Sequence, residues 1–432
     1  MCRALARYTE AGIIVSHKHT DSYSAVPKIG IALVGPGLVG RLVLEQFSSA
    51  ALRPHFRIVS ISNSRYTVFD NDCGSDATES VALEALLASL PASSQTLSSG
   101  EATTSTRVAV GELAPAELVE RLVLRAKQSG SHIVLIDCTA SDALPKVYAQ
   151  ALRAGLSVAT PNKVAPAGPE ALYRPIREAQ ASPSAGLFYC EGACGAGLPV
   201  LSTLADLVRT GDEIVKIEAV LSGTLSYIFN QYSTVETPPA GETPLRFSEI
   251  VRSAHEHGHT EPHPAEDLSG RDVARKLAIL ARLSTSPTSS SSTQTRAIDL
   301  PKGSASIPTQ SLIPYKIAEV RDPKTFVDKL AAHDEVFETM RKEAQKAGQV
   351  LRYVGVLDRE NGKIECGLRQ FAPDHPFASL SGSHLSFAIY TKRYSSSPLV
   401  IQGPGYPVEV TASAVIADTI RVAERYGHRF GL

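Results

Sequence analysis

A glycine-rich turn between an apolar run and a helical run constrains the fold of this chain most strongly. Residues 28–34 are mostly apolar, as in a buried strand, and residues 41–47 have apolar side chains at helical spacing. The glycines between them permit a tight turn, approach to a pyrophosphate and close helix packing. This context predicts a Rossmann-type dinucleotide-binding domain, and the alternative is an ordinary glycine turn. The expected cofactor-contacting residues of the turn are Gly35, Pro36, Gly37, Leu38, Val39 and Gly40.

The residues after the next predicted strand bear on the choice between NAD and NADP. In NAD-selective sites an acid about 20 positions beyond the glycines binds the ribose 2′-hydroxyl. Here residues 62–65 read Ser-Asn-Ser-Arg, and the first acid is Asp70. The missing carboxylate removes repulsion against a 2′-phosphate, and Arg65 could pair with that phosphate. NADP is therefore at least tolerated beside NAD, whereas in the alternative interpretation Arg65 only faces solvent.

Composition excludes several classes of partner. The 432 residues are 43% hydrophobic and 20% charged with a formal net charge of −1, so no overall charge attracts the chain to nucleic acid or to a membrane surface. No apolar run reaches the roughly 18 residues that a membrane span needs. The six cysteines are scattered and indicate free thiols in a reducing compartment, which favours the cytoplasm. We therefore expect a small-molecule substrate and no nucleic-acid or membrane partner.

The chain is long enough for two domains and a terminal extension. Residues 1–27 precede the first convincing strand and are expected to form a flexible extension, with a weak mitochondrial-type leader as the alternative. A Ser/Thr-rich stretch near residues 284–306 indicates an insertion. We expect the dinucleotide-binding domain to comprise residues 28–188 and 400–432, and residues 189–399 to form the second domain.

One loop-to-helix junction, residues 258–276, gathers several carboxylates and a lysine. Two prolines favour an extended entry, and Ser269 could cap the helix that follows. Asp272 and Lys276 then lie one turn apart on the same helix face. Such a lysine could exchange protons with a substrate hydroxyl while the acids hold a cationic group. The structural alternative is a capping box of Ser269 and Asp272 beside an ordinary solvated ion pair.

That junction resembles the substrate-binding signature of homoserine dehydrogenases. The family pattern G-x-T-E-P-x-P, then D-L-x-G-x-D-V-A-R-K, is filled at every fixed position. The resemblance implies NAD(P)-dependent, reversible reduction of L-aspartate 4-semialdehyde to L-homoserine, as in threonine and methionine biosynthesis. It also implies a fold of the α/β class: a Rossmann-type nucleotide-binding domain plus an α+β catalytic and dimerisation domain with a central mixed sheet, in a homodimer.

Residue roles follow from the same resemblance. Lys276 is expected to exchange the proton with the substrate oxygen, and Lys163, which ends a Thr-Pro-Asn-Lys run, is its rival. Two neighbouring lysines would each have a lowered pKa, which would help proton exchange. The expected substrate-binding residues are Glu261, Asp267, Asp272, Gly223 and Thr224. The expected cofactor-binding residues outside the glycine turn are Arg65, Thr139, Lys163 and Pro407.

A glycine-dense turn at residues 191–198 resembles the family's site for a monovalent cation such as Na⁺. Backbone oxygens plus one carboxylate suit a hard cation. An extra Cys190 precedes the glutamate, whereas family members often have glutamate directly after tyrosine. The alternative is a turn that holds no ion. The ligands carried over are Glu191, Cys194, Ala196 and Leu198.

The chain departs from the family pattern at two places. Tyr406 and Pro407 replace small residues of a terminal glycine-rich loop, and His384 and Leu385 replace an acid and an amide. Proline lacks an N–H and fixes φ, which would restrict a loop that gates the site. Two alternatives therefore stay open: a paralogous oxidoreductase that acts on another amino-aldehyde, and a non-catalytic nucleotide-binding sensor. The intact lysines and acids argue against the sensor.

Overall fold

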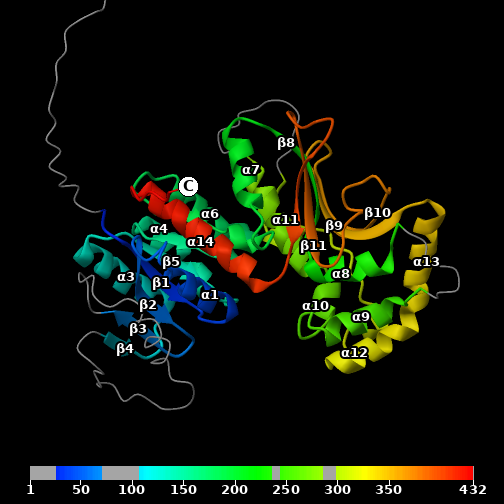
Figure 1. The fold of residues 1–432 in the computed structure, drawn as a ribbon, viewed down its shortest axis with the longest axis horizontal. Coiled ribbons are helices and arrows are strands. Elements are labelled where there is room, and N and C mark those ends of the chain that lie inside the picture. Colours follow the sequence, from blue (N-terminus) through cyan, green and yellow to red (C-terminus); the bar gives the residue numbers. More distant parts are fainter. Residues whose placement is uncertain (1–25, 71–106, 236–243, 286–297, 432) are drawn as a thin grey trace, which may run out of the picture.

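The computed structural model describes residues 26–70, 107–235, 244–285 and 298–431, which form two sheets with helices packed around them (Figure 1). Most of the expected N-terminal extension, and residues 286–297 of the expected insertion, lie outside the described residues. The first sheet lies at the left of Figure 1 and the second at the right. Within the described residues, no helix is both long and apolar enough to cross a membrane.

The first sheet has seven strands in the order β4-β3-β2-β1-β5-β6-β7. Neighbouring strands in the part β2-β1-β5-β6-β7 are parallel. At the other edge β3 and β4 pair antiparallel, so this sheet is mixed. Its central strand β1 has β2 on one side and β5 on the other, which places a topological switch point at the carboxyl ends of β1 and β5. The bounds are β1 (Ile29–Val34), β2 (Phe56–Ser62), β3 (Thr67–Asp70), β4 (Arg107–Val110), β5 (Ile133–Asp137), β6 (Ser157–Ala159) and β7 (Phe188–Tyr189).

Helices cover both faces of this sheet. Alternate residues of β1 explain why: Ile31 and Leu33 pack in one cluster with side chains of α1 and α14, and Ala32 packs in the other cluster with α3 and α4. The strand is therefore buried on both faces, as its apolar sequence predicts. The helices are α1 (Leu38–Phe47), α3 (Pro115–Ser129), α4 (Tyr148–Arg153), α5 (Val164–Ala167), α6 (Glu170–Gln180) and α14 (Val408–Arg425).

The second sheet has five strands in the order β10-β9-β8-β11-β12, and every neighbouring pair is antiparallel. The mixed pairing expected for this sheet is found in the first sheet instead. The register pairs Lys363 with Asp358, so a short turn joins β9 to β10, and such a turn gives antiparallel strands. The bounds are β8 (Ile214–Val220), β9 (Val350–Asp358), β10 (Lys363–Phe371), β11 (His384–Thr391) and β12 (Leu399–Pro404).

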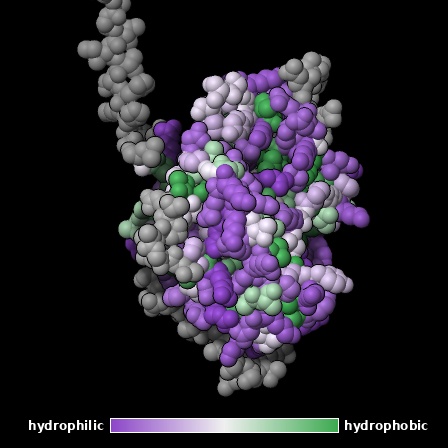
Figure 2. Space-filling view, turned by 90° about the vertical axis from the view of Figure 1, so that its right-hand side faces the viewer, coloured by the Kyte–Doolittle hydropathy of each residue, from purple (hydrophilic) through white to green (hydrophobic). Residues whose placement is uncertain are grey.

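One face of the second sheet packs on helices. Ile217, Phe387 and Ile389 point into a core shared with α8 and α11. The segment from Phe371 to Leu380 packs on part of the other face. Seen from the side of the second domain, the surface is mostly hydrophilic, with hydrophobic residues in small separate groups (Figure 2). The helices are α7 (Val200–Arg209), α8 (Gly223–Tyr232), α9 (Phe247–Glu256), α10 (Ala265–Leu268), α11 (Arg271–Leu283), α12 (Pro323–Leu330) and α13 (Asp334–Lys346).

The chain returns to the first sheet later than expected. A boundary at residue 400 would place β12 in the dinucleotide-binding domain, but β12 pairs with β11 in the second sheet. The crossing therefore follows Pro404, and α14 then packs on α1. This helix begins at Val408, and its N-cap residue, Pro407, has no N–H that needs a partner.

Candidate active site

The glycine turn after β1 has the geometry of a phosphate-binding turn. Gly35 has φ +87°, and a Cβ there would lie 3.0 Å from the backbone N of Thr139. A Cβ at Gly40 would lie 2.2 Å from the carbonyl oxygen of Gly35. A Cβ at Gly37 would meet nothing within 4 Å, so this glycine leaves space that the protein does not fill. With no side-chain cap on α1, its first N–H groups are available to a phosphate.

Arg65 lies on the turn next to the glycine turn. The N–H of Gly35 donates to the carbonyl oxygen of Ser62 at the end of β2. Asn63 Oδ1 accepts from the N–H groups of Arg65 and Tyr66, both at 2.8 Å, which fixes the turn. The Arg65 side chain is exposed there. It therefore lies where the ribose end of a dinucleotide is bound in this class of sheet.

Of two further residues expected at the cofactor, Thr139 lies at this edge and Pro407 lies at the start of α14. Thr139 follows β5, and a Cβ at Gly35 would lie 2.7 Å from its Cγ2. Pro407 is the residue that precedes α14, and Tyr406 before it is 62% exposed. Leu385, one of the departures from the family pattern, is buried, and a Cβ at Gly405 would lie 2.9 Å from its Cγ. Leu385 therefore supports the loop that leads to Tyr406.

The start of α11 differs from the expected serine cap. Gly270 is the N-cap residue, with φ +71°, and no side chain caps the helix. Ser269 Oγ instead donates to the carbonyl oxygen of Glu266 and accepts from the N–H of Arg271. The glycine is required because a Cβ would lie 2.0 Å from Oη of Tyr353. A residue of β9 thus restricts the N-cap position of α11 to glycine.

Two lysines flank one carboxylate between the domains. Lys276 Nζ lies 2.9 Å from Asp272 Oδ2, as the helical spacing predicts, and donates to the carbonyl oxygen of Leu221 at 2.7 Å. Lys163 Nζ, which comes from the first domain, lies 3.5 Å from Asp272 Oδ1. Further along α11, Arg282 donates to carbonyl oxygens of α5 and its C-cap, at Pro166 and Gly168. Helices α5 and α11 are therefore joined at both ends of their contact, through Lys163 and Asp272 at one end and through Arg282 at the other.

The charges of this group support each other. Burial acts to raise the pKa of Asp272, but attraction from Lys276 and then Lys163 outweighs it and lowers the pKa. Burial acts to lower the pKa of Lys276, but the Asp272 carboxylate outweighs it and raises the pKa. The expected lowering is therefore wrong for Lys276, because its closest charged group is a carboxylate rather than the other lysine. Lys276 stays protonated at neutral pH.

The other expected substrate residues lie around the N-terminus of α8. Gly223 and Thr224 are its first residues, and Thr224 Oγ1 donates to the carbonyl oxygen of His259 at 2.8 Å. Asp267 Oδ2 accepts from the N–H of Glu261 at 2.8 Å. Burial raises the pKa of Asp267 to about 6, although hydrogen bonds from Glu261 and Thr224 oppose it. The Glu261 side chain is exposed and available to a ligand.

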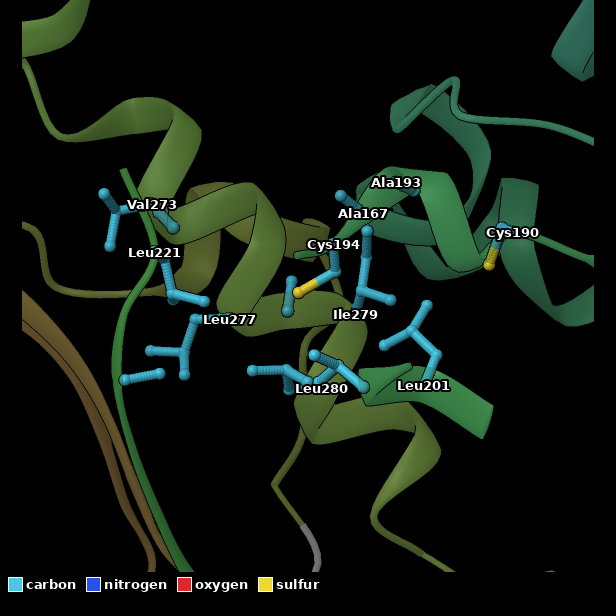
Figure 3. Close-up of a cluster of buried hydrophobic side chains, with 14 of the residues drawn as sticks. Ala167, Cys190, Ala193, Cys194, Leu201, Leu221, Val273, Leu277, Ile279 and Leu280 are labelled. Carbon is cyan, nitrogen blue, oxygen red and sulfur yellow. The ribbon is translucent and has the colours of Figure 1, made fainter. Parts of the chain in front are cut away.

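The expected cation turn packs against α11. Figure 3 shows Cys194 pointing toward α11, among Leu277, Ile279 and Leu280. Its sulfur lies 4.0 Å from the carbonyl oxygen of Lys276, and burial raises the pKa of its thiol to about 12. Gly195 and Ala196 both have positive φ, 94° and 56°, so the backbone there turns sharply. This turn thus contacts the helix that bears the lysine.

Glu191 has a structural role that its sequence did not reveal. Its carboxylate accepts from the N–H groups of Leu201 and Ser202 in the first turn of α7, at 2.7 and 2.9 Å. Arg421 on α14 lies 3.4 Å from its Oε2 and also pairs with buried Asp418. Burial raises the pKa of Asp418 to about 7. Both carboxylates therefore join α14 to the second domain.

Comparisons with known proteins identify the family. The family model described as homoserine dehydrogenase matches residues 199–420, and that of its NAD-binding domain matches residues 35–189. The homoserine dehydrogenases of Saccharomyces cerevisiae and Emericella nidulans are 33% and 36% identical to this chain, over 92% of its length and over 98% and 99% of theirs. The chain belongs to the homoserine dehydrogenase family. The resemblance read from residues 258–276 is confirmed, and the first domain matches the NAD-binding domain of that family.

Other homoserine dehydrogenase relatives differ in length or in similarity. Bifunctional aspartokinase/homoserine dehydrogenase 2 of Zea mays is 36% identical over 95% of this chain, which spans 40% of the length of that protein. A Candida auris protein described as of unknown function has a TM-score of 0.77 at 32% identity, over 93% of this chain and 99% of its own. A hyperthermophilic archaeal homoserine dehydrogenase, solved with NADPH, shares the fold at a TM-score of 0.60 and 22% identity, over 92% and 98% of the two chains.

Sequence reasoning missed one buried group of this homoserine dehydrogenase fold. Asp137, at the end of β5, is fully buried and accepts a hydrogen bond from the hydroxyl of Tyr148. Asn162, next to Lys163, donates to the same carboxylate at 3.1 Å. An aspartate that ends an otherwise apolar strand was the available signal, because ligands of such sheets bind at the carboxyl ends of strands.

Proposed function

We propose that this protein catalyses the NAD(P)-dependent, reversible interconversion of L-aspartate 4-semialdehyde and L-homoserine. The observation that carries the proposal is the group formed by Lys276, Asp272 and Lys163, where α11 of the second domain meets the first domain. The glycine turn before α1 would bind the dinucleotide, and the residues around the N-terminus of α8 would bind the amino acid substrate.

The described residues fit this chemistry. When it is bound, the nicotinamide supplies the hydride that reaches the aldehyde carbon. Lys276 holds a proton for the substrate oxygen, because Asp272 keeps its amine charged and the carbonyl oxygen of Leu221 orients it. Lys163 lies at the longer distance from Asp272 and reaches the site from the cofactor side. We therefore assign proton donation in the reductive direction to Lys276 and orientation of the substrate to Lys163.

The ammonium group of the amino acid is the natural partner of Glu261 and Asp267. Glu261 is exposed, whereas Asp267 is half-buried beside Thr224. Burial raises the pKa of Asp267, so its carboxyl group loses its charge under mildly acidic conditions. The affinity for the amino acid should therefore fall when Asp267 loses its negative charge.

A pH series tests this assignment. As the pH falls through about 6, Asp267 takes up a proton and no longer attracts an ammonium group, so KM for homoserine should rise. The rise should approach about tenfold per pH unit below that pKa. Asp267→Asn should give a high KM that no longer changes between pH 5 and 7, a range set by the raised pKa of about 6. If KM of the Asp267→Asn variant still rose at low pH as it does in the wild type, the role of Asp267 would be contradicted.

Arg65 is proposed to distinguish the two cofactors. Its place beyond β2, without an acid at the end of that strand, suits a 2′-phosphate. Arg65→Ala should therefore raise the Kd of NADP about tenfold and leave that of NAD unchanged, measured by titration. Arg41→Ala is the matched control, because Arg41 hydrogen-bonds to Pro36 of the same turn. Equal losses for NAD and NADP in Arg65→Ala would exclude a role in discrimination.

The homodimer is a proposal that the second sheet supports. On β12, Val400, Gln402 and Pro404 are exposed on the face away from the helices. On the same face, Lys216 of β8 pairs with Glu218. This face carries both apolar and charged side chains. A second copy of this chain would cover it in a dimer with two-fold symmetry. The double change Val400→Glu, Gln402→Glu should then give a monomer by sedimentation equilibrium, whereas Val336→Glu on α13 should not.

The monovalent cation is proposed for the turn at residues 194–198. The carbonyl oxygens of Cys194, Ala196 and Leu198 are ligands of the type that a hard cation prefers, and the positive φ of Gly195 and Ala196 turns the backbone there. Glu191 fits a ligand role poorly, because Arg421 already lies against its carboxylate and would repel a second cation. Turnover should be higher in Na⁺ than in a bulky organic cation at equal ionic strength. Equal turnover would exclude a cation with a role in catalysis.

Two other statements stay proposals. A cytoplasmic location is supported by the four described cysteines, all of which are unpaired. A paralogous activity on another amino-aldehyde is supported by exposed Tyr406 at the loop before α14. Turnover of L-homoserine compared with other amino alcohols tests this second candidate, because a paralogue would prefer another substrate.

A further inference from the structure

We propose that Asp137 and Asn162 are positioning residues that fix Lys163 relative to the cofactor turn. The inference rests on the proposed reaction, in which Lys163 must meet the substrate at a fixed distance from the nicotinamide. It adds a buried hydrogen-bond network that does not touch substrate and acts through Lys163.

The network begins with a carboxylate that has only neutral partners. Asp137 is fully buried, and its Oδ2 accepts from the hydroxyl of Tyr148 and from Nδ2 of Asn162. Its Oδ1 accepts from the N–H of Thr139 at 2.8 Å. Within the described residues, no lysine or arginine forms an ion pair with it. A buried charge without a cation costs several kcal/mol, so burial raises the pKa of Asp137, and the hydrogen bonds from Tyr148, Thr139 and Asn162 offset only part of that cost.

Asn162 connects the carboxylate to the backbone on both sides of Lys163. Its Nδ2 donates to Asp137 and to the carbonyl oxygen of Ser141, at 3.1 and 2.9 Å. Its Oδ1 accepts from the N–H of Val164 at 2.8 Å. Asn162 and Val164 precede and follow Lys163, so this one amide holds the backbone from which the Lys163 side chain extends.

The same carboxylate reaches the cofactor turn. The Thr139 N–H that it binds belongs to the residue whose methyl group contacts Gly35. The carbonyl oxygen of Asp137 also accepts from Thr160 Oγ1 at 2.7 Å, at the start of the Thr-Pro-Asn-Lys run. Asp137 therefore joins the glycine-turn side of the site to the lysine side through two short paths.

The far end of Lys163 shows what this positioning serves. Its Nζ lies 3.5 Å from Asp272, which in turn holds Lys276. A displacement of about 1 Å at a catalytic site can lower turnover about 100-fold. A shift of residues 162–164 would therefore slow hydride and proton transfer, while every residue of the glycine turn stays present.

A double-mutant cycle tests the link. Asn162→Ala should lower kcat 10- to 100-fold, an order of magnitude set by misplacement, with the Kd of NADPH unchanged. In a Lys163→Ala background, the same change should add no more than about twofold, because interacting residues are not additive. Full multiplication of the two effects would overturn the proposal.

A second readout does not depend on turnover. Chemical labelling of Lys163 by an amine reagent, followed by mass spectrometry of its peptide, should be several-fold faster in Asn162→Ala, because the amine leaves Asp272. If Asn162→Ala does not fold, Tyr148→Phe removes one hydroxyl from the network, and Tyr173→Phe on α6 is its matched control. Faster labelling of Lys163 in Tyr148→Phe but not in Tyr173→Phe supports the link between the network and Lys163. Equal labelling in wild type, Tyr148→Phe and Tyr173→Phe overturns it. If the proposed reaction is wrong, the wild type will be inactive on homoserine. The labelling rates of Lys163 still test the link between the network and Lys163 in that case.

Discussion

Replacing Lys276 with alanine is expected to lower turnover by a factor on the order of 100, because the proton for the substrate oxygen is lost. The Kd of the cofactor should stay unchanged, since the lysine binds Asp272 and the carbonyl oxygen of Leu221 rather than the glycine turn. Stopped-flow and steady-state rates with homoserine, together with cofactor titration, measure both quantities.

A matched control separates this effect from the loss of a helix ion pair. Lys342 on α13 also pairs with an acid four residues earlier, Glu338, but its side chain is 65% exposed. Lys342→Ala should leave turnover unchanged. A loss of less than about tenfold in Lys276→Ala would mean that Lys276 is only a helix partner of Asp272.

Replacing Gly270 with alanine is expected to destabilise the protein by about 2–5 kcal/mol. The left-handed conformation at φ +71° costs an alanine about 1–2 kcal/mol. The new methyl group would lie 2.0 Å from Oη of Tyr353, and such overpacking costs about 1–3 kcal/mol. Turnover should fall as well, because Gly270 begins the helix that carries Asp272 and Lys276. Chemical unfolding and steady-state rates test the two effects.

The strain and the clash can be separated. Gly348 also has a left-handed φ of +67° in the second domain, but a Cβ there would meet nothing within 4 Å. Gly348→Ala should therefore cost only the strain, about 1–2 kcal/mol. Adding Tyr353→Phe to Gly270→Ala should recover part of the lost stability, because the closest atom is removed. Equal losses in the two alanine variants would contradict a clash with Tyr353.

Local spacing was sufficient to predict some parts of the site. A strand, three glycines and a helix predicted the phosphate turn because the pattern is local in sequence, and the 2.2 Å approach of a Cβ at Gly40 to the carbonyl oxygen of Gly35 is a constraint of the same kind. The pair of Asp272 and Lys276 was predicted because residues four apart share a helix face. The family signature added the residues of the loop before α11; the comparisons confirm the family, and the roles of those residues stay predictions.

Contacts between distant segments could not be predicted in this way. Ser269 was expected to cap α11, but the N-cap residue is Gly270, where Tyr353 of β9 leaves no room for a Cβ. The pKa of Lys276 was expected to be lowered, yet its direction depends on a carboxylate and on burial that only the folded chain provides. Asp137 carried no motif, because its partners come from α4 and from the turn before α5.

Incubation of the purified protein with L-homoserine and either NADP or NAD tests the central claim most directly. Reduced cofactor and L-aspartate 4-semialdehyde are expected to form in equal amounts, and the reverse reaction is expected to consume both. Cofactor binding without turnover of homoserine in either direction would contradict the claim, and so would faster oxidation of a different amino alcohol.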